Sequence, residues 1–143
     1  ANDRQTEAQY MMVFAHIYQS LWITRRALDH YEKSIELFAL LQDKDGEARC
    51  VMQMGILNFQ RGDTASAIKC LEEALSIATK NSHGSTISDC LMAIGEVHFS
   101  QGDFKQMLAH FQKASRVCKE QLDPFGEAKG WCGMARANLG LGQ

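Results

Sequence analysis

Apolar residues recur three and four positions apart along almost the whole chain, which is the spacing of one face of an α-helix. Met11, Phe14, Ala15 and Tyr18 follow this spacing and predict a helix over 3–20 with these side chains facing inward. No stretch alternates apolar and polar residues as a half-buried strand would. The pattern therefore predicts an all-α chain.

Six further helices are expected, with short polar turns at 42–46 and 81–84 and glycines at the breaks at Gly62 and Gly102. Asp103 followed by Gln106 resembles a capping box, and Asp123 precedes a proline at the first helical position, so both aspartates mark helix starts. The expected starts are Thr24, Glu47, Asp63, the residue after the 81–84 turn, Asp103 and Asp123.

The chain resembles itself when it is shifted by about forty residues. Small residues, turn residues and apolar residues each recur at this period, in the sets Ala15/Gly55/Gly95/Ala135, Trp22/Gly62/Gly102/Gly142, Ala27/Ala67/Met107, Tyr31/Leu71/Phe111 and Ser34/Ala74/Ala114. Self-similarity at a fixed period of this length indicates a solenoid built from helix pairs.

The residues that recur at this period resemble the pattern of the tetratricopeptide repeat. The matching features are the apolar–glycine pair of the first helix, its opening apolar residue and aromatic, the turn glycine, and the spaced small and large residues of the second helix. They are Met54-Gly55, Ile94-Gly95, Val51, Trp131, Tyr18, Gly62, Gly102, Ala67-Leu71-Ala74, Ala27-Tyr31 and Phe111-Ala114. The resemblance implies a right-handed α-solenoid of antiparallel helix pairs, with seven helices in a single array over 1–143. The expected repeats are 6–42, 46–82, 86–122 and the first helix of a fourth over 124–143.

The period is longer than the thirty-four residues that are common in this family, and in this respect it looks like the long-helix subclass of Pins-type adaptors, rapsyn and some bacterial regulators. Family membership implies that the first helices line a concave groove that binds a peptide or partner helix, without catalysis. The expected groove residues are Met12, His16, Arg49, Met52, Gln53, Ile56, Asp89, Met92, Glu96, Lys129 and Arg136.

Two interpretations of the groove methionines are open. Met12, Met52 and Met92 recur as a ladder of flexible, polarizable side chains that suits an apolar partner. Methionines at helical spacing can also be ordinary core residues, and this second interpretation is favoured for Phe59 and Phe99. The basic and asparagine residues of two known family grooves, the carboxylate clamp and the Pins-type groove, do not occur at the matching positions, so neither ligand class is transferred.

Catalytic and metal chemistry is not indicated. His30, Cys70 and His110 lie one repeat apart, too far to share one ion at metal–ligand distances of about 2.0–2.3 Å. His98 is expected to be a core histidine with a hydrogen-bonded partner, and His16 to face the groove. No nucleophile lies beside a base and no glycine-rich phosphate loop occurs, so we expect no enzyme activity and no cofactor.

The composition excludes some classes of binding partner. With a formal net charge of −2 and both signs interspersed, the chain has no basic patch for nucleic acid or an anionic membrane, and it has no apolar run long enough to span a bilayer. Its five cysteines lack a Cys-x-x-Cys pair and are expected to be reduced and mostly buried, as in a cytoplasmic protein.

The last helix carries an apolar face at Trp131, Met134 and Ala135 that a second helix would cover in a complete repeat. The missing initiator methionine and the end within a repeat suggest a fragment, whose parent covers this face or which pairs it with a second copy as a homodimer. The expected function is therefore a protein-interaction scaffold or adaptor. The alternatives are a structural or self-assembly segment and a sensor of a small ligand or signalling peptide.

Overall fold

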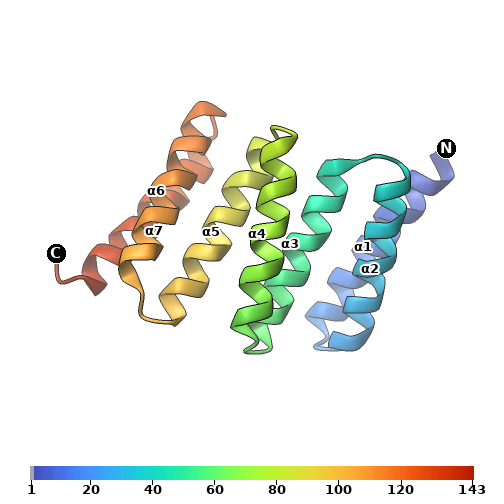
Figure 1. Ribbon diagram of the computed structural model, residues 1–143, viewed down its shortest axis with the longest axis horizontal. Helices are drawn as coiled ribbons and strands as arrows, with labels where there is room; N and C mark the ends of the chain where they lie inside the picture. The colour runs from blue at the N-terminus through green and yellow to red at the C-terminus, as the bar shows by residue number, and fades with distance from the viewer. Residues whose placement is uncertain (1) are drawn as a thin grey trace. The chain divides into compact units, whose positions relative to one another are not determined.

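The computed structural model describes residues 2–143, and over this range the chain forms seven α-helices and no strands (Figure 1). The all-α prediction is therefore confirmed. Within each unit consecutive helices run antiparallel, and three-residue connections join the helices along the chain. The helices are α1 (Asn2–Ser20), α2 (Thr24–Leu40), α3 (Lys44–Gln60), α4 (Thr64–Lys80), α5 (Gly84–Ser100), α6 (Phe104–Glu120) and α7 (Pro124–Gly140).

All seven helices end in the same turn. The second residue after each helix adopts a left-handed backbone with φ between 55° and 85°, and the next backbone N–H bonds to a carbonyl five residues earlier, as Asp63 N does to Asn58 O at 3.0 Å. This is the Schellman arrangement. The left-handed residues are Trp22, Gln42, Gly62, Ser82, Gly102, Leu122 and Gly142. A 17-residue helix and its three-residue turn together account for half of the forty-residue period.

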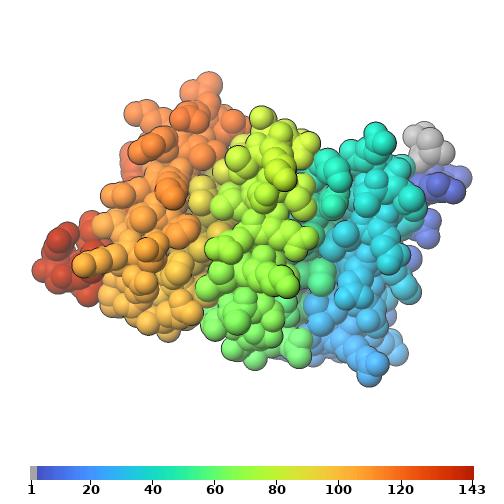
Figure 2. Space-filling model, in the orientation of Figure 1, coloured from blue at the N-terminus to red at the C-terminus, as the bar shows by residue number. Residues whose placement is uncertain are grey.

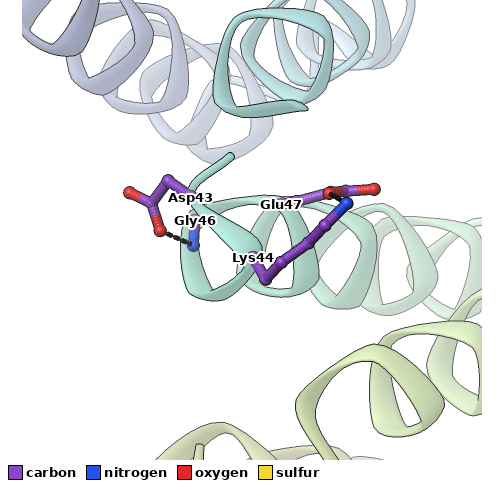
Figure 3. Close-up of polar contacts among 4 residues, drawn as sticks. All are labelled: Asp43, Lys44, Gly46 and Glu47. Atoms are coloured by element: carbon purple, nitrogen blue, oxygen red, sulfur yellow. Dashed lines mark hydrogen bonds and ion pairs between the residues drawn. The ribbon is translucent and has the colours of Figure 1, made fainter. Parts of the chain in front are cut away.

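Aspartate side chains start four of the helices, because a carboxylate oxygen accepts an otherwise unpaired backbone N–H of the first turn. At α3, Asp43 accepts from Gly46 N at 2.9 Å, and Lys44 forms an ion pair with Glu47 at 2.7 Å (Figure 3). The expected turn over 42–46 is therefore too long, because this cap begins the helix at Lys44. The turn at 81–84 is also shorter than expected, since Gly84 is already helical.

The three aspartate caps predicted from the sequence are confirmed. Asp63 Oδ1 accepts from Ser66 N at 3.1 Å, and Asp103 Oδ1 accepts from Gln106 N at 3.1 Å. Asp123 Oδ1 accepts from Gly126 N at 3.0 Å, with proline at the first helical position. These starts were readable from the sequence because the donor and the acceptor lie three residues apart.

The chain divides into two compact units, of which unit 1 covers Ala1–Ile77 and unit 2 covers Ala78–Gln143. The core of unit 1 is formed by α1, α2 and α3, whose shared buried side chains are Ala8, Ala15, Ala27, Tyr31, Phe38, Cys50 and Leu57. Figure 2 shows the α2 side of this unit, where the α2 side chains, light blue to cyan, form a closed surface.

Small residues set the distance between paired helices in both units. In unit 1, Gly55 of α3 lies against Leu71 and the backbone of Ala67 on α4. In unit 2, Gly95 of α5 lies under the ring of Phe111 on α6. The core of unit 2 is formed around Met107, Phe111 and Ala137. The expected contact between the small residues of a helix pair is confirmed in unit 1 at Gly55 and Ala67.

One prediction about α1 is wrong. Phe14 was expected on the inner face, but 48% of its surface is exposed, whereas Ala8 and Ala15 are fully buried. The spacing of three and four residues fits both faces of this helix, because apolar residues surround much of it. Packing against α2 selects the face that carries the small alanines, since these allow the helices to approach closely.

Candidate functional site

The first-helix face of unit 1 is formed by α1 and α3 and carries a polar network around Tyr31 of α2. The buried Tyr31 hydroxyl donates to Gln19 Oε1 at 2.7 Å and lies 3.1 Å from His16 Nδ1. Gln19 Nε2 in turn donates to Gln60 Oε1 at 3.0 Å. Because the phenol has one proton and gives it to Gln19, the Nδ1–H of His16 donates to the phenol oxygen. The network thus links α1, α2 and α3.

His16 is a neutral hydrogen-bonding group on this face. Burial and the positive charge of Arg49 both lower the pKa of the His16 imidazole below its ordinary value of 6.5, because each disfavours the charged form. With its Nδ1 proton directed at Tyr31, the imidazole presents Nε2 as an acceptor. Burial also raises the pKa of the Tyr31 hydroxyl, which keeps the phenol protonated as the donor of the network.

Arg49 is the cation of this face. Its side chain is exposed on α3, close enough to His16 to influence the imidazole electrostatically. Within residues 2–143, Arg49 forms no ion pair with a carboxylate. Gln53 and Ile56, one and two helical turns further along α3, are half-buried, and Val13 of α1 is half-exposed. The face therefore combines a cation, polar side chains and a modest apolar surface.

The corresponding face of unit 2 has its main charges paired with each other. Arg136 of α7 makes two hydrogen bonds to the Glu96 carboxylate of α5, at 2.7 and 3.3 Å. The guanidinium also lies 4.3 Å from the ring centre of Phe99. Asp89 and Lys129 are exposed on the same two helices, and the Lys129 ammonium lies 4.5 Å from the ring centre of Phe125.

The three methionines of the predicted ladder are largely packed. Met12 packs against the core of unit 1, and Met92 packs against the core of unit 2. Met52 differs most from its expected place in a groove, because only 6% of its surface is exposed. Packing accounts for these side chains, and a role of Met12 or Met92 in binding stays a prediction.

The histidines outside this face do not form a ligand cluster. The His98 and His110 rings lie 5.2 Å apart in unit 2, and His30 Nδ1 is bonded to the carbonyl of Arg26. His98 was expected to have a hydrogen-bonded partner; its Nδ1 is enclosed and has none among residues 2–143. Over the same residues, no group of three or more potential metal ligands comes together.

The cysteines are free thiols, and Cys50, Cys90 and Cys118 are buried as expected. Burial raises the pKa of the Cys50 thiol to about 11 and that of the Cys90 thiol to about 12. These two groups therefore remain protonated near neutral pH and are poor nucleophiles.

The predicted association face of α7 is accessible in part. Trp131 is 58% exposed and Ala135 is exposed, whereas Met134 packs against the core of unit 2. The association itself stays a prediction.

The sequence profile of the family described as tetratricopeptide repeat matches residues 14–80. This segment is therefore similar to the tetratricopeptide repeat. Proteins with tetratricopeptide repeats generally mediate protein–protein interactions and generally act as non-catalytic scaffolds. A search of curated protein sequences finds no match. None of the helices described for this repeat protein is both long and apolar enough to cross a membrane.

Solved structures with tetratricopeptide-like helices share the fold. Aspartyl phosphate phosphatase F from Bacillus subtilis is 16% identical, with a TM-score of 0.89 over 99% of this chain and 37% of that chain. BtubC (BKLC) from P. vanneervenii is 15% identical, with a TM-score of 0.81 over 94% of this chain and 56% of that chain. Nearly identical TPR-like repeats from Podosopora anserina, named as a kinesin light chain, are 13% identical, with a TM-score of 0.75 over 94% and 67% of the two chains.

The structural similarity to these proteins establishes the solenoid fold of antiparallel helix pairs. Sequence identities this low establish nothing finer. The repeat protein spans less than two thirds of the first two of these chains. One of the similar structures is named as a phosphatase, so a shared fold alone does not separate binding from catalysis.

The sequence identified His16 and Arg49 separately but not their relationship. The electrostatic effect of Arg49 on His16 depends on how α3 packs beside α1, thirty-three residues later in the chain. The hydrogen bonds of Tyr31 were also missed, because large residues at this position of the repeat are usually explained by packing alone. The tyrosine itself could have indicated them, since the hydroxyl of a buried tyrosine usually has a hydrogen-bond partner.

Proposed function

We propose that this chain is a protein-interaction scaffold that binds a peptide or partner helix on the first-helix face of unit 1. The observation that carries the proposal is Arg49, an exposed cation beside a neutral imidazole, with no carboxylate partner among residues 2–143. Arginine presents several donors in a planar fork that suits a carboxylate. The ligand we propose is therefore an amphipathic segment with an acidic residue.

The remaining side chains of the face define the rest of the ligand. Val13 and Ile56 offer apolar surface for one or two aliphatic side chains, and Gln53 offers both a donor and an acceptor. His16 Nε2 accepts a hydrogen bond from the ligand while its Nδ1–H remains on Tyr31. Since the polar network holds His16 in place, its orientation is set before the ligand arrives.

A library of acidic amphipathic peptides tests this proposal against the unmodified chain and Arg49→Glu. The expected result is a set of peptides whose binding weakens by about tenfold or more on charge reversal, a change of ~1.4 kcal/mol. Lys33→Glu on α2 is the matched control, because Lys33 is also an exposed cation of unit 1. Equal losses in both variants would show that only net charge matters, and would contradict a site at Arg49.

Unit 2 offers a second face with a different character. Because Glu96 and Arg136 are paired, a ligand there must displace or bridge an existing ion pair. We propose that Asp89, Met92 and Lys129 contribute contacts to a separate segment that binds unit 2 with lower affinity. Met92→Glu should then weaken binding of that segment, whereas Arg49→Glu in unit 1 should not.

The alternative function is self-assembly through α7, where the exposed indole of Trp131 is the supporting observation. Light scattering over a range of concentrations tests it. A dimer that Trp131→Glu dissociates would favour assembly, whereas a constant monomeric mass would exclude it over that range.

Two finer assignments also remain proposals. The 17-residue length of α2 to α7 and the forty-residue period support the long-helix subclass of the family. The five free thiols support a reducing compartment such as the cytoplasm. Retention of all five thiols in protein isolated without reductant would support this location, and a disulfide in the isolated protein would contradict it.

A further inference from the structure

An apolar stripe on α1, extended by Leu21 directly after the helix, points away from the first-helix face. Its side chains are 47–61% exposed, and they are spaced by four, three and four residues, as along the contact line of two packed helices. The stripe consists of Tyr10, Phe14, Ile17 and Leu21. On the helical wheel it lies about a third of a turn from His16, so it is separate from the site proposed above.

Helix α3 has the place of α1 in the next repeat, and its equivalent face is covered by a neighbouring helix. Gly46 lies against the ring of Phe38, and Cys50 Sγ donates to Ser34 Oγ at 3.4 Å. Both partners are on α2, which runs antiparallel to α3 and brings its C-terminal end to the start of α3 (Figure 1). The face of α3 that corresponds to the α1 stripe is therefore occupied by an antiparallel helix.

The stripe of α1 differs from this equivalent face in side-chain volume. At the positions of Gly46 and Cys50, α1 carries Thr6 and Tyr10, which are both larger. A helix with a phenylalanine in the place of Phe38 would collide with these side chains at the same interhelical distance. An occupant of α1 therefore needs alanine, glycine or serine opposite Thr6 and Tyr10.

The N-terminal end of the stripe is acidic. Asp3 and Glu7 border a shallow hollow of about 310 Å³. Neither carboxylate forms an ion pair within residues 2–143. The hollow is lined by Asp3, Thr6, Glu7, Tyr10, Met11 and Phe14. Two carboxylates beside an aromatic ring suit a lysine or arginine side chain, whose stem packs on the ring while its charge meets the carboxylates.

We propose that α1 is a docking surface for an amphipathic helix of a partner protein, bound antiparallel along this stripe. The partner helix places small residues opposite Thr6 and Tyr10 and a lysine or arginine of its last turn in the acidic hollow. The polarity agrees with the helix dipoles, because cations are favoured at a helix C-terminus and carboxylates at the start of α1.

A synthetic helical peptide provides the probe: alanines at the two positions facing Thr6 and Tyr10, leucines facing Ile17 and Leu21, and two lysines in its last turn. Fluorescence anisotropy measures its binding to the full chain. Tyr10→Lys should weaken binding by about tenfold or more, because the apolar contact is lost and a like charge is added. Leu139→Lys, at an exposed apolar position on α7, should leave binding unchanged.

A charge exchange tests the orientation without altering the apolar stripe. Glu7→Lys should weaken binding of the lysine peptide, and a peptide with glutamates in the last turn should recover it. Glu72→Lys, at an exposed position on α4, should neither weaken binding of the lysine peptide nor favour the glutamate peptide. Circular dichroism confirms that each variant is folded.

Three outcomes would overturn the proposal. The first is that the peptide fails to bind, or binds Tyr10→Lys as well as the unmodified chain. The second is a dimer of this chain that Tyr10→Lys dissociates, which would make a second copy the occupant. The third is binding to phosphatidylserine vesicles that the same substitution abolishes, which would assign the stripe to a membrane surface.

Discussion

Gly55 of α3 lies so close to Leu71 of α4 that a methyl group at Gly55 would be 2.8 Å from Leu71 Cγ and 3.2 Å from the carbonyl oxygen of Ala67. Leu71 is fully buried, and the carbonyl belongs to the backbone, so neither neighbour can move far. The close approach of this helix pair therefore depends on the absence of a side chain at residue 55.

We expect Gly55→Val to destabilise the protein by ~1–3 kcal/mol, because overpacking forces the two helices apart. Urea unfolding followed by circular dichroism measures the change. Ala65→Val on the exposed surface of α4 is the control, since it introduces the same β-branched residue without a close neighbour. Equal losses in the two variants would mean that helix propensity, not packing, dominates.

Trp22 occupies a turn position where the equivalent residues are Gly62, Gly102 and Gly142. Its φ is 60° and its side chain is 76% exposed, so the backbone is strained while the indole gains little from burial. Trp22→Gly should therefore stabilise the chain by ~0.5–1 kcal/mol, the relief of strain being partly offset by the flexibility of glycine in the unfolded state.

The reciprocal variant, Gly62→Ala, should destabilise by ~1 kcal/mol, because φ at Gly62 is 85°. Denaturant midpoints of the two variants provide the comparison. A loss of stability in Trp22→Gly would show that the indole makes a favourable contact that outweighs the strain.

The lowered pKa of His16 gives folding a specific pH dependence. The unfolded chain protonates this histidine near pH 6.5, and the folded chain does so only at lower pH. Between these two values the unfolded state binds more protons, so the free energy of unfolding falls as the pH falls, and full stability is present above about pH 6.5. His16→Gln should flatten this part of the profile.

Urea unfolding at a series of pH values tests this expectation, with His30→Gln as a matched loss of a histidine from unit 1. If the slope between pH 6.5 and 5 is the same in His16→Gln as in the unmodified chain, His16 is not the group responsible.

The Asp43 carboxylate connects two helices, because it caps α3 through Gly46 N and accepts from Gln5 Nε2 of α1 at 3.2 Å. Asp43→Ala should cost ~1–2 kcal/mol, the usual loss for an N-cap together with a side-chain bond. Asp29→Ala, an exposed acid on α2, should change stability by less than ~0.5 kcal/mol. Similar thermal midpoints for both variants would contradict the capping role.

The parts of the fold that depend on neighbouring residues were predictable from the sequence. The caps at Asp63, Asp103 and Asp123 join groups three residues apart, and each turn repeats one local hydrogen-bond pattern. The forty-residue period likewise identified the paired helices, because each pair needs small residues where its helices touch.

Which face of each helix remains accessible was decided only by tertiary packing. Phe14 is exposed although its spacing predicted an inward position, and Met52 is buried although the family resemblance implied a place in the groove. His16 is influenced by Arg49 and bonded to Tyr31 because three helices converge there. Helical periodicity places a residue on a face of its own helix, but accessibility and charge at that face depend on the neighbouring helices that pack against it.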